Sequence, residues 1–159
     1  MNDISLLCHA LAETLLQRDW RLCTAESCTG GLIAARCTDL PGSSQWFERG
    51  WVSYSNEAKS ELLGVPSSLI AEHGAVSEAV AQAMAVGARR HARAQVSVAV
   101  TGIAGPSGGS ADKPVGTVWL AWDVNGSVSS QHCLFAGDRG HVREATVRQA
   151  LQGLIQRLT

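Results

Sequence analysis

The sequence predicts a single layered α/β/α domain, residues 1–159, with a mixed sheet between its helices. Two observations favour this class. Helix-type and strand-type segments alternate over the first part of the chain, as parallel strands joined by helices require. Further on, strand-type segments at 115–124 and 128–135 flank Asn125-Gly126, a dipeptide typical of a tight hairpin. A hairpin pairs its strands antiparallel, so the sheet should contain both strand directions.

The first half of the chain gives these signals in order: a helix at 4–18, a strand at 21–25, a helix at 32–37, a strand at 51–54 and a short helix after Ser55. The first helix has an apolar stripe at helical spacing, formed by Ile4, Leu7, Leu11 and Leu15. Pro41-Gly42 stops the second helix. Ser55 is a suitable N-cap because its hydroxyl can accept a hydrogen bond from the first helical turn.

The second half predicts a helix at 77–93, a buried strand at 95–100, the two hairpin strands and a closing helix at 140–158. Gly64 and Pro66 end the short helix that precedes them. The strand at 95–100 is rich in valine, as buried strands are. Residues 101–116 contain too much glycine and proline for a regular element, and loops of this length in a compact domain are usually functional.

Composition is that of an ordinary globular protein with one core. Of the 159 residues, 45% are hydrophobic and 17% are charged. The 13 Lys+Arg and 14 Asp+Glu give a formal net charge of −1, which argues against a surface dedicated to nucleic acid or anionic membrane. No apolar run approaches the ~20 residues that span a bilayer, and the N-terminus lacks the basic segment of a secretory signal. We therefore expect a cytoplasmic protein.

The metal-binding residue types show no metal-site spacing. The cysteines are odd in number and lack C-x-x-C spacing, which indicates reduced thiols: Cys8, Cys23, Cys28, Cys37 and Cys133. The five histidines form no H-E-x-x-H pattern. We expect neither a metal nor a cofactor.

The first candidate site is the turn from Glu26 to Gly31, between a strand and a helix. Ser27 on this turn could be a nucleophile, with an oxyanion held by backbone N–H groups near Gly30 and Gly31. Its hydroxyl could equally cap the helix, because the hydrolase elbow G-x-S-x-G is absent. Cys28 is a rival nucleophile or a small core residue.

Lys59 is the second candidate because it has no acidic neighbour at helical spacing. The positions three and four residues away are Ser55, Asn56, Leu62 and Leu63, so the usual helical ion pair is missing. A lysine that acts as a base needs a pKa about 3 units below its ordinary value, through burial or a nearby positive charge. A solvated lysine is the alternative interpretation.

Two further segments offer places for a ligand. The glycine-rich stretch from Thr101 has neither a P-loop nor a Rossmann pattern, and it either lets a ligand rest on backbone amides or is a plain flexible connection. Arg139 lies where the last helix begins, and its charge opposes the helix dipole there. A bound anion would make that charge favourable, whereas Glu144 and solvent could also screen it.

Seven stretches of the chain, in this order, closely resemble the family of the CinA C-terminal domain: Thr24-Ala25-Glu26-Ser27-Cys28-Thr29-Gly30-Gly31, Trp46-Phe47-Glu48-Arg49-Gly50, Tyr54-Ser55-Asn56-Glu57-Ala58-Lys59, His73-Gly74-Ala75-Val76-Ser77, Thr101-Gly102-Ile103-Ala104-Gly105-Pro106, Lys113-Pro114-Val115-Gly116-Thr117-Val118 and Gly137-Asp138-Arg139. The resemblance covers nearly the whole chain. The resemblance is strongest to the stand-alone members of the family, the nicotinamide-nucleotide amidohydrolases. These members lack the N-terminal domain of the longer CinA proteins.

The resemblance implies a cofactor-free enzyme that hydrolyses the carboxamide of nicotinamide mononucleotide (NMN) to nicotinate mononucleotide and ammonia. Ser27 matches the family's nucleophile, Lys59 its catalytic lysine and Arg139 an active-site arginine. Tyr54 is expected to orient Lys59. The expected substrate-binding residues are Cys28, Thr29, Gly30, Gly31, Thr101, Gly102, Gly105 and Arg139.

Two other functions and one structural question stay open at this point. A cysteine amidase would use Cys28, with Ser27 only capping the helix. A regulatory module would bind the nucleotide without turnover, since fold does not establish activity. The tryptophans, with Trp46 and Trp51 close together, fit either a homo-oligomer interface or the core. The expected partner is the small-molecule substrate, with no nucleic acid and no membrane.

Overall fold

Five strands form one mixed sheet in the order β2-β1-β3-β4-β5 in the computed structural model, which describes residues 3–159. The strands are β1 (Leu22–Glu26), β2 (Phe47–Val52), β3 (Val96–Gly102), β4 (Thr117–Val124) and β5 (Ser127–Leu134). The helices are α1 (Asp3–Arg18), α2 (Leu32–Thr38), α3 (Asn56–Leu63), α4 (Ser67–His73), α5 (Glu78–His91) and α6 (Arg139–Leu158), with a 3-10 helix η1 at Ser43–Gln45. The strands β1, β2 and β3 run parallel, and β4 and β5 pair antiparallel.

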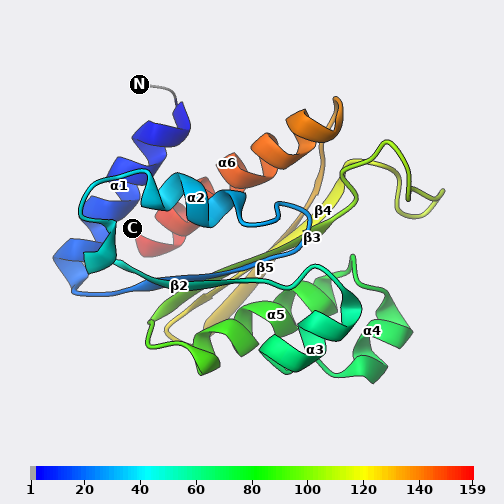
Figure 1. Cartoon of the computed structure of the whole chain (residues 1–159), viewed down its shortest axis with the longest axis horizontal. Helices are drawn as coiled ribbons and strands as arrows, with labels where there is room; N and C mark the ends of the chain where they lie inside the picture. The colour runs from blue at the N-terminus through cyan, green and yellow to red at the C-terminus, as the bar shows by residue number, and fades with distance from the viewer. Residues whose placement is uncertain (1–2) are drawn as a thin grey trace.

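The helices cover both faces of this sheet, so the α/β class with a mixed sheet is confirmed. Helices α1, α2 and α6 lie on one face and α3, α4 and α5 on the other (Figure 1). Strand side chains alternate between the faces. Large residues point towards the first face, among them Leu22, Val98, Leu120 and Trp122. Small residues point towards α5, namely Cys23, Ala25, Ala99 and Ala121. The small side chains let α5 pack closely on the centre of the sheet.

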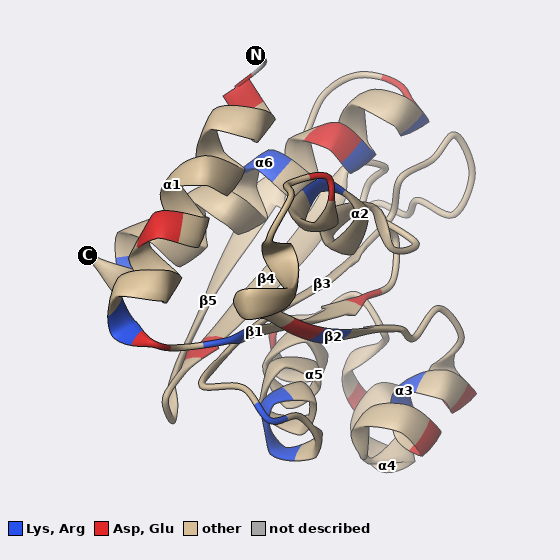
Figure 2. Cartoon of the chain, turned by 60° about the vertical axis from the view of Figure 1, so that its left-hand side comes forward, with Lys and Arg blue, Asp and Glu red and all other residues tan. Residues whose placement is uncertain are grey.

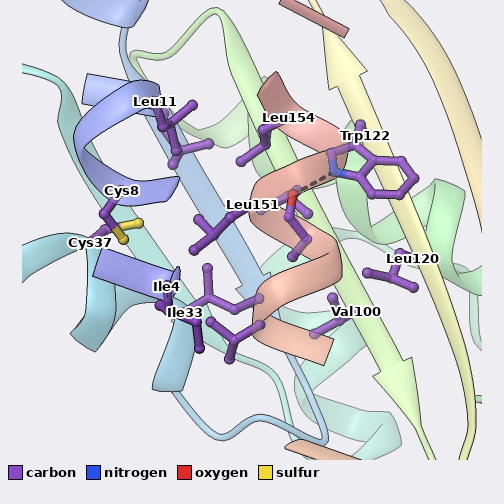
Figure 3. Packing of buried hydrophobic residues seen from close by; sticks show 14 of the residues in the cluster. Ile4, Cys8, Leu11, Ile33, Cys37, Val100, Leu120, Trp122, Leu151 and Leu154 are labelled. Atoms are coloured by element: carbon purple, nitrogen blue, oxygen red, sulfur yellow. Dashed lines mark hydrogen bonds between the residues drawn. The ribbon is translucent and has the colours of Figure 1, made fainter. Parts of the chain in front are cut away.

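The core on the α1, α2 and α6 side is built around large side chains from distant segments (Figure 3). Trp122 is fully buried, and its indole Nε1 donates to the carbonyl oxygen of Ala150 at 3.1 Å. Trp46 also lies in this core, and Trp51 packs against the second cluster under α5. The two neighbouring tryptophans therefore contribute to the interior.

Several element boundaries differ from the sequence prediction. The strand expected at 51–54 begins four residues earlier, at Phe47, and ends before Ser53. The polar residues Glu48 and Arg49 remove the apolar pattern by which a strand is predicted. They are tolerated because β2 is an edge strand with partly solvated faces. Helix α4 was not predicted, and Val115 belongs to the loop before β4.

The strand order makes the end of β1 a topological switch point. The chain goes from β1 to β2 on one side and returns to β3 on the other. Helices then leave the sheet on opposite faces, and ligands of α/β proteins bind at this kind of switch point, beyond the carboxyl ends of the strands. The turn that carries Ser27 follows β1 directly.

Charged residues are spread over the surface in both signs. Acidic and basic segments alternate on helices at both faces of the sheet (Figure 2). Within residues 3–159, none of the helices has the length and apolar character needed to cross a membrane.

Candidate active site

Ser27 sits at the switch point, just beyond the end of β1. Its backbone N–H donates to the carbonyl oxygen of Val100 at 3.1 Å, which ties the turn to β3. Its side chain is almost buried, with 8% of the residue exposed. The hydroxyl Oγ lies 3.4 Å from the carbonyl oxygen of Tyr54 and does not cap α2. Ser27 is therefore a positioned hydroxyl at the expected ligand crevice.

Lys59 reaches this hydroxyl from the opposite face of the sheet. It lies on α3, whose N-cap is Ser55, with its hydroxyl accepting from the N–H of Ala58 at 3.0 Å. Only 1% of Lys59 is exposed, so the solvated interpretation is wrong. Its Nζ is 3.1 Å from Ser27 Oγ, 3.0 Å from the carbonyl oxygen of Ser53 and 3.1 Å from that of Tyr54.

Oxygen atoms of Ser27, Ser53 and Tyr54 surround the Lys59 amine. Burial lowers the pKa of Lys59, because the charged form loses its hydration. Among residues 3–159, no carboxylate lies within ion-pair distance of Nζ to oppose this effect. A neutral amine has two N–H donors and one lone pair. In the neutral form the two carbonyl oxygens would accept from these donors, and the Ser27 hydroxyl would donate to the lone pair.

Glu26 organises the turn from inside, a role that the sequence analysis missed. Its buried carboxylate accepts hydrogen bonds from Thr29 Oγ1 at 2.5 Å, Ile33 N at 2.8 Å and Ala34 N at 3.0 Å. It therefore occupies donors at the start of α2, which cannot also stabilise an oxyanion. An acidic side chain a few residues before a predicted helix start is the sequence signal for this role, because the helix dipole favours negative charge there.

The backbone N–H groups next to Ser27 remain as candidate oxyanion donors. Those of Cys28 and Thr29 donate to no carbonyl or side-chain oxygen among the residues that the structure describes. Gly30 and Gly31 have φ values of 60° and 101°, which L side chains rarely adopt. These glycines allow the sharp turn that puts α2 directly after Ser27.

Two threonines expected to bind substrate are engaged within the protein. Thr29 is fully buried, and its hydroxyl donates to Glu26. Thr101 is 1% exposed, and its hydroxyl donates to the carbonyl oxygen of Ala75 at 3.0 Å. Both hydroxyls are bonded to protein oxygens in this structure, and substrate binding by these two residues stays a prediction. At Gly102 an added Cβ would lie 2.7 Å from Val118 Cγ2, and this packing explains the glycine without a ligand.

The Cys28 thiol lies in the core beside the turn. Desolvation by burial raises its pKa to about 12, so it is protonated at neutral pH and a poor nucleophile.

We accordingly expect Cys28→Ala to keep kcat for carboxamide hydrolysis within about fivefold of wild type, with about 1 kcal/mol lost from the free energy of unfolding through the smaller side chain. Steady-state ammonia release and a urea titration measure the two effects. A loss of activity above a hundredfold in a folded protein would contradict this and assign the chemistry to the thiol.

Arg139 bridges two loops and lines a cavity. It donates from Nη1 to the carbonyl oxygen of Gly105 at 2.9 Å and from Nη2 to the Tyr54 hydroxyl at 3.3 Å. Tyr54 thus contacts Arg139 with its exposed phenol and Lys59 with its backbone carbonyl. A cavity of about 640 Å³ lies beside Arg139, between residues 104–115 and the start of α6.

Arg143, one turn further along α6, is a basic residue that reaches the Ser27 turn. Its Nε donates to the carbonyl oxygen of Cys28 at 3.2 Å and its Nη2 to that of Thr29 at 3.0 Å. The sequence analysis did not name Arg143 among the candidate site residues. Within residues 3–159, no three His, Cys, Asp or Glu side chains gather as a metal site.

A protein-family model, the CinA C-terminal domain, matches residues 5–158. The chain belongs to that family. The match includes at least part of every helix and strand, and it contains the Ser27 turn and the start of α6.

Relatives within the CinA family differ in length. The chain is 48% identical to the nicotinamide-nucleotide amidohydrolase PncC of Escherichia coli K12, over 98% of this chain and 94% of the relative. It is 51% identical to PncC of Pseudomonas putida, over 98% of both chains. A CinA-like protein of Akkermansia muciniphila is also 51% identical, but the chain spans only 36% of its length.

Solved structures of CinA-family proteins have the same fold. The competence/damage inducible protein CihA of Agrobacterium tumefaciens superposes with a TM-score of 0.96 at 46% identity, covering 98% of this chain and 96% of that one. A CinA superfamily protein of Klebsiella pneumoniae gives 0.95 at 39% identity, covering 99% and 98%. The layered architecture described above is therefore that of the family.

Proposed function

We propose that this protein hydrolyses the carboxamide of NMN, releasing ammonia and nicotinate mononucleotide. The observation that carries the proposal is the buried Lys59 amine, 3.1 Å from the Ser27 hydroxyl, with no carboxylate paired to it in the described chain. A serine beside a neutral lysine can act as a nucleophile, with the lysine as its general base. The substrate comes from the two PncC relatives, which are named as nicotinamide-nucleotide amidohydrolases.

The first half-reaction forms an acyl-enzyme. Lys59 Nζ takes the proton of Ser27 as Oγ attacks the carboxamide carbon, and the carbonyl oxygen becomes an oxyanion. The N–H groups of Cys28 and Thr29 hold that oxyanion. The Lys59 ammonium then returns its proton to the departing nitrogen, so that the C–N bond breaks and ammonia leaves.

The second half-reaction regenerates the hydroxyl. A water molecule gives a proton to neutral Lys59 and attacks the ester carbon, and collapse of the tetrahedral intermediate returns that proton to Ser27 Oγ. The positive pyridinium of NMN helps in both halves. It makes the carboxamide carbon more electrophilic, and its charge disfavours the ammonium form of Lys59.

The test is ammonia release from NMN by the purified protein, with nicotinate mononucleotide measured as the second product. Equal amounts of both products support the amidohydrolase. A folded protein that binds NMN but releases no ammonia would instead be a regulatory nucleotide-binding module, and the proposal would be wrong.

We further propose that Arg139 recognises the substrate phosphate. Two of its N–H groups contact protein oxygens, which leaves further donors of the guanidinium for a ligand in the adjoining cavity. The carboxylate of Asp138 lines the same cavity and is paired with His141, whose N–H and ring lower the pKa of Asp138. The negative charge of Asp138 repels a phosphate. Phosphate binding in this cavity therefore requires that attraction by Arg139 exceed this repulsion.

Arg139→Ala should therefore lower kcat/KM for NMN about 10- to 150-fold, the loss of an Arg–phosphate contact worth about 1.5–3 kcal/mol. Nicotinamide riboside has no phosphate, so it should be a poor substrate for wild type and lose little more in the variant. The measurement is kcat/KM for both substrates with both proteins. Equal losses of kcat/KM for NMN and for the riboside would contradict phosphate recognition. They would assign Arg139 to carboxamide binding or to support of the fold.

A further inference from the structure

Arg143 holds two consecutive carbonyl groups of the Ser27 turn with one guanidinium. The contacts are 3.2 Å from Nε to the oxygen of Cys28 and 3.0 Å from Nη2 to the oxygen of Thr29. A forked donor that bonds two neighbouring peptides fixes their planes, which a single contact would not do.

The positive charge of Arg143 interacts with these two carbonyl oxygens. Arg143 is half-buried in the second turn of α6, near the helix end where the dipole disfavours a cation. Within the described residues it forms no ion pair, and neighbouring Glu144 pairs with Arg36 at 2.7 Å. Among residues 3–159, the oxygens that accept from the Arg143 guanidinium are these two carbonyls.

Peptide geometry connects this contact to the oxyanion. The Cys28 carbonyl and the Thr29 N–H belong to one peptide, and the only cis peptide among residues 3–159 is Gly105-Pro106. In a trans peptide the C=O and N–H point in opposite directions. Holding the Cys28 carbonyl towards α6 therefore turns the Thr29 N–H away from α6. The guanidinium also polarises the peptide and strengthens its N–H as a donor.

We propose that Arg143 is a positioning residue for acyl transfer, which aims the Thr29 N–H at the oxyanion formed when Ser27 attacks. This inference rests on the proposed function. Arg143 itself does not touch the substrate in this scheme. It acts on the transition state through the backbone of the turn, so its removal should affect kcat much more than KM.

The experiment compares Arg143→Met and Arg143→Lys with Arg148→Met. Arg148 is the matched control, because it lies on the same helix but pairs with Asp3 at the surface. We expect Arg143→Met to lower kcat for NMN about 10- to 100-fold with KM within about threefold, since a misaimed donor loses part of the effect of one oxyanion contact. Arg143→Lys should restore part of kcat, because an ammonium can bond one carbonyl but lacks the fork.

A tetrahedral-adduct probe separates positioning from general support. The 3-aldehyde analogue of NMN can add Ser27 Oγ to its carbonyl carbon and so creates the oxyanion without a leaving group. Its affinity should fall in Arg143→Met by the same factor as kcat. The affinity of NMN itself, measured in a Ser27→Ala background, should stay within about threefold.

The outcomes are distinguishable. If wild type releases no ammonia from NMN, the proposed function fails and this inference falls with it. If wild type is active and Arg143→Met matches it in kcat and aldehyde affinity, only the inference is wrong. Equal losses of NMN and aldehyde affinity, with a lowered Tm and no partial rescue by lysine, would make Arg143 a structural residue. If Arg143→Met does not fold, kcat and aldehyde affinity are compared between Arg143→Lys and wild type instead.

Discussion

Ser27→Ala should lower kcat for NMN hydrolysis by about 10³-fold or more, because the variant has no oxygen to form the acyl-enzyme. NMN binding should survive. The alanine keeps the backbone bond from residue 27 to Val100, and the Glu26 carboxylate still holds the turn and the start of α2. Ammonia release measures the first effect, and calorimetric titration with NMN measures the second.

The controls for this prediction isolate the hydroxyl. Ser44→Ala removes an exposed serine of η1 and should leave kcat at the wild-type value. Rapid acid quenching of wild type with NMN, followed by mass spectrometry of the intact protein, should find the acyl group on residue 27. Retention of more than a tenth of kcat in Ser27→Ala, together with an inactive Cys28→Ala, would transfer the nucleophile to the thiol.

Replacing Lys59 should have an effect of similar size. We expect Lys59→Ala and Lys59→Arg each to lower kcat by about 10²- to 10⁴-fold, the range for loss of a general base. Arginine keeps a cation but stays protonated, so it cannot accept the Ser27 proton. Lys113→Arg is the matched control, because Lys113 is the other lysine of the chain and bonds the His73 carbonyl at 2.8 Å. A kcat near the wild-type value in Lys59→Arg would contradict the role of Lys59 as a base and leave it only an electrostatic role.

The same assignment determines a pH profile. A base works in its deprotonated form, so kcat/KM should rise with pH as free-enzyme Lys59 loses its proton. Burial lowers the pKa of Lys59, so this limb should lie below the ordinary lysine value of about 10.4. Lys113→Arg should leave the limb in place. A profile that is flat from pH 6 to 9 with no rising limb above would contradict the assignment to a titrating lysine.

The elements that the sequence predicted well depend on contacts within a few residues. The N-caps are examples, since Ser55 accepts from Ala58 at 3.0 Å and Ser77 accepts from Val80 at 3.3 Å. The hairpin is another, with Asn125 at φ 51° and Gly126 at φ 99°. Such geometry follows from side-chain length and backbone freedom, which local sequence specifies.

The elements that it missed depend on partners far along the chain. Strand β2 pairs with β1, and Trp51 lies opposite Ala25 in the register. Its Glu48 and Arg49 bond each other, a contact that gives no strand periodicity. Helix α4 buries Ile70 against the cluster under α5. Tertiary packing overrides weak local propensity in both segments.

Sequence by itself determined the α/β class and the family resemblance, and it selected the candidate site positions, because residue types and local periodicity are properties of short segments. Tertiary structure alone decided which of those positions meet and how deeply they are buried. The strand order brings the ends of β1 and β2 together, so that Lys59 meets Ser27 across 32 residues of chain. Arg143 reaches the turn across more than a hundred residues. Burial, proton affinity and hydrogen-bond partners belong to this assembled environment, and a segment read alone does not contain them.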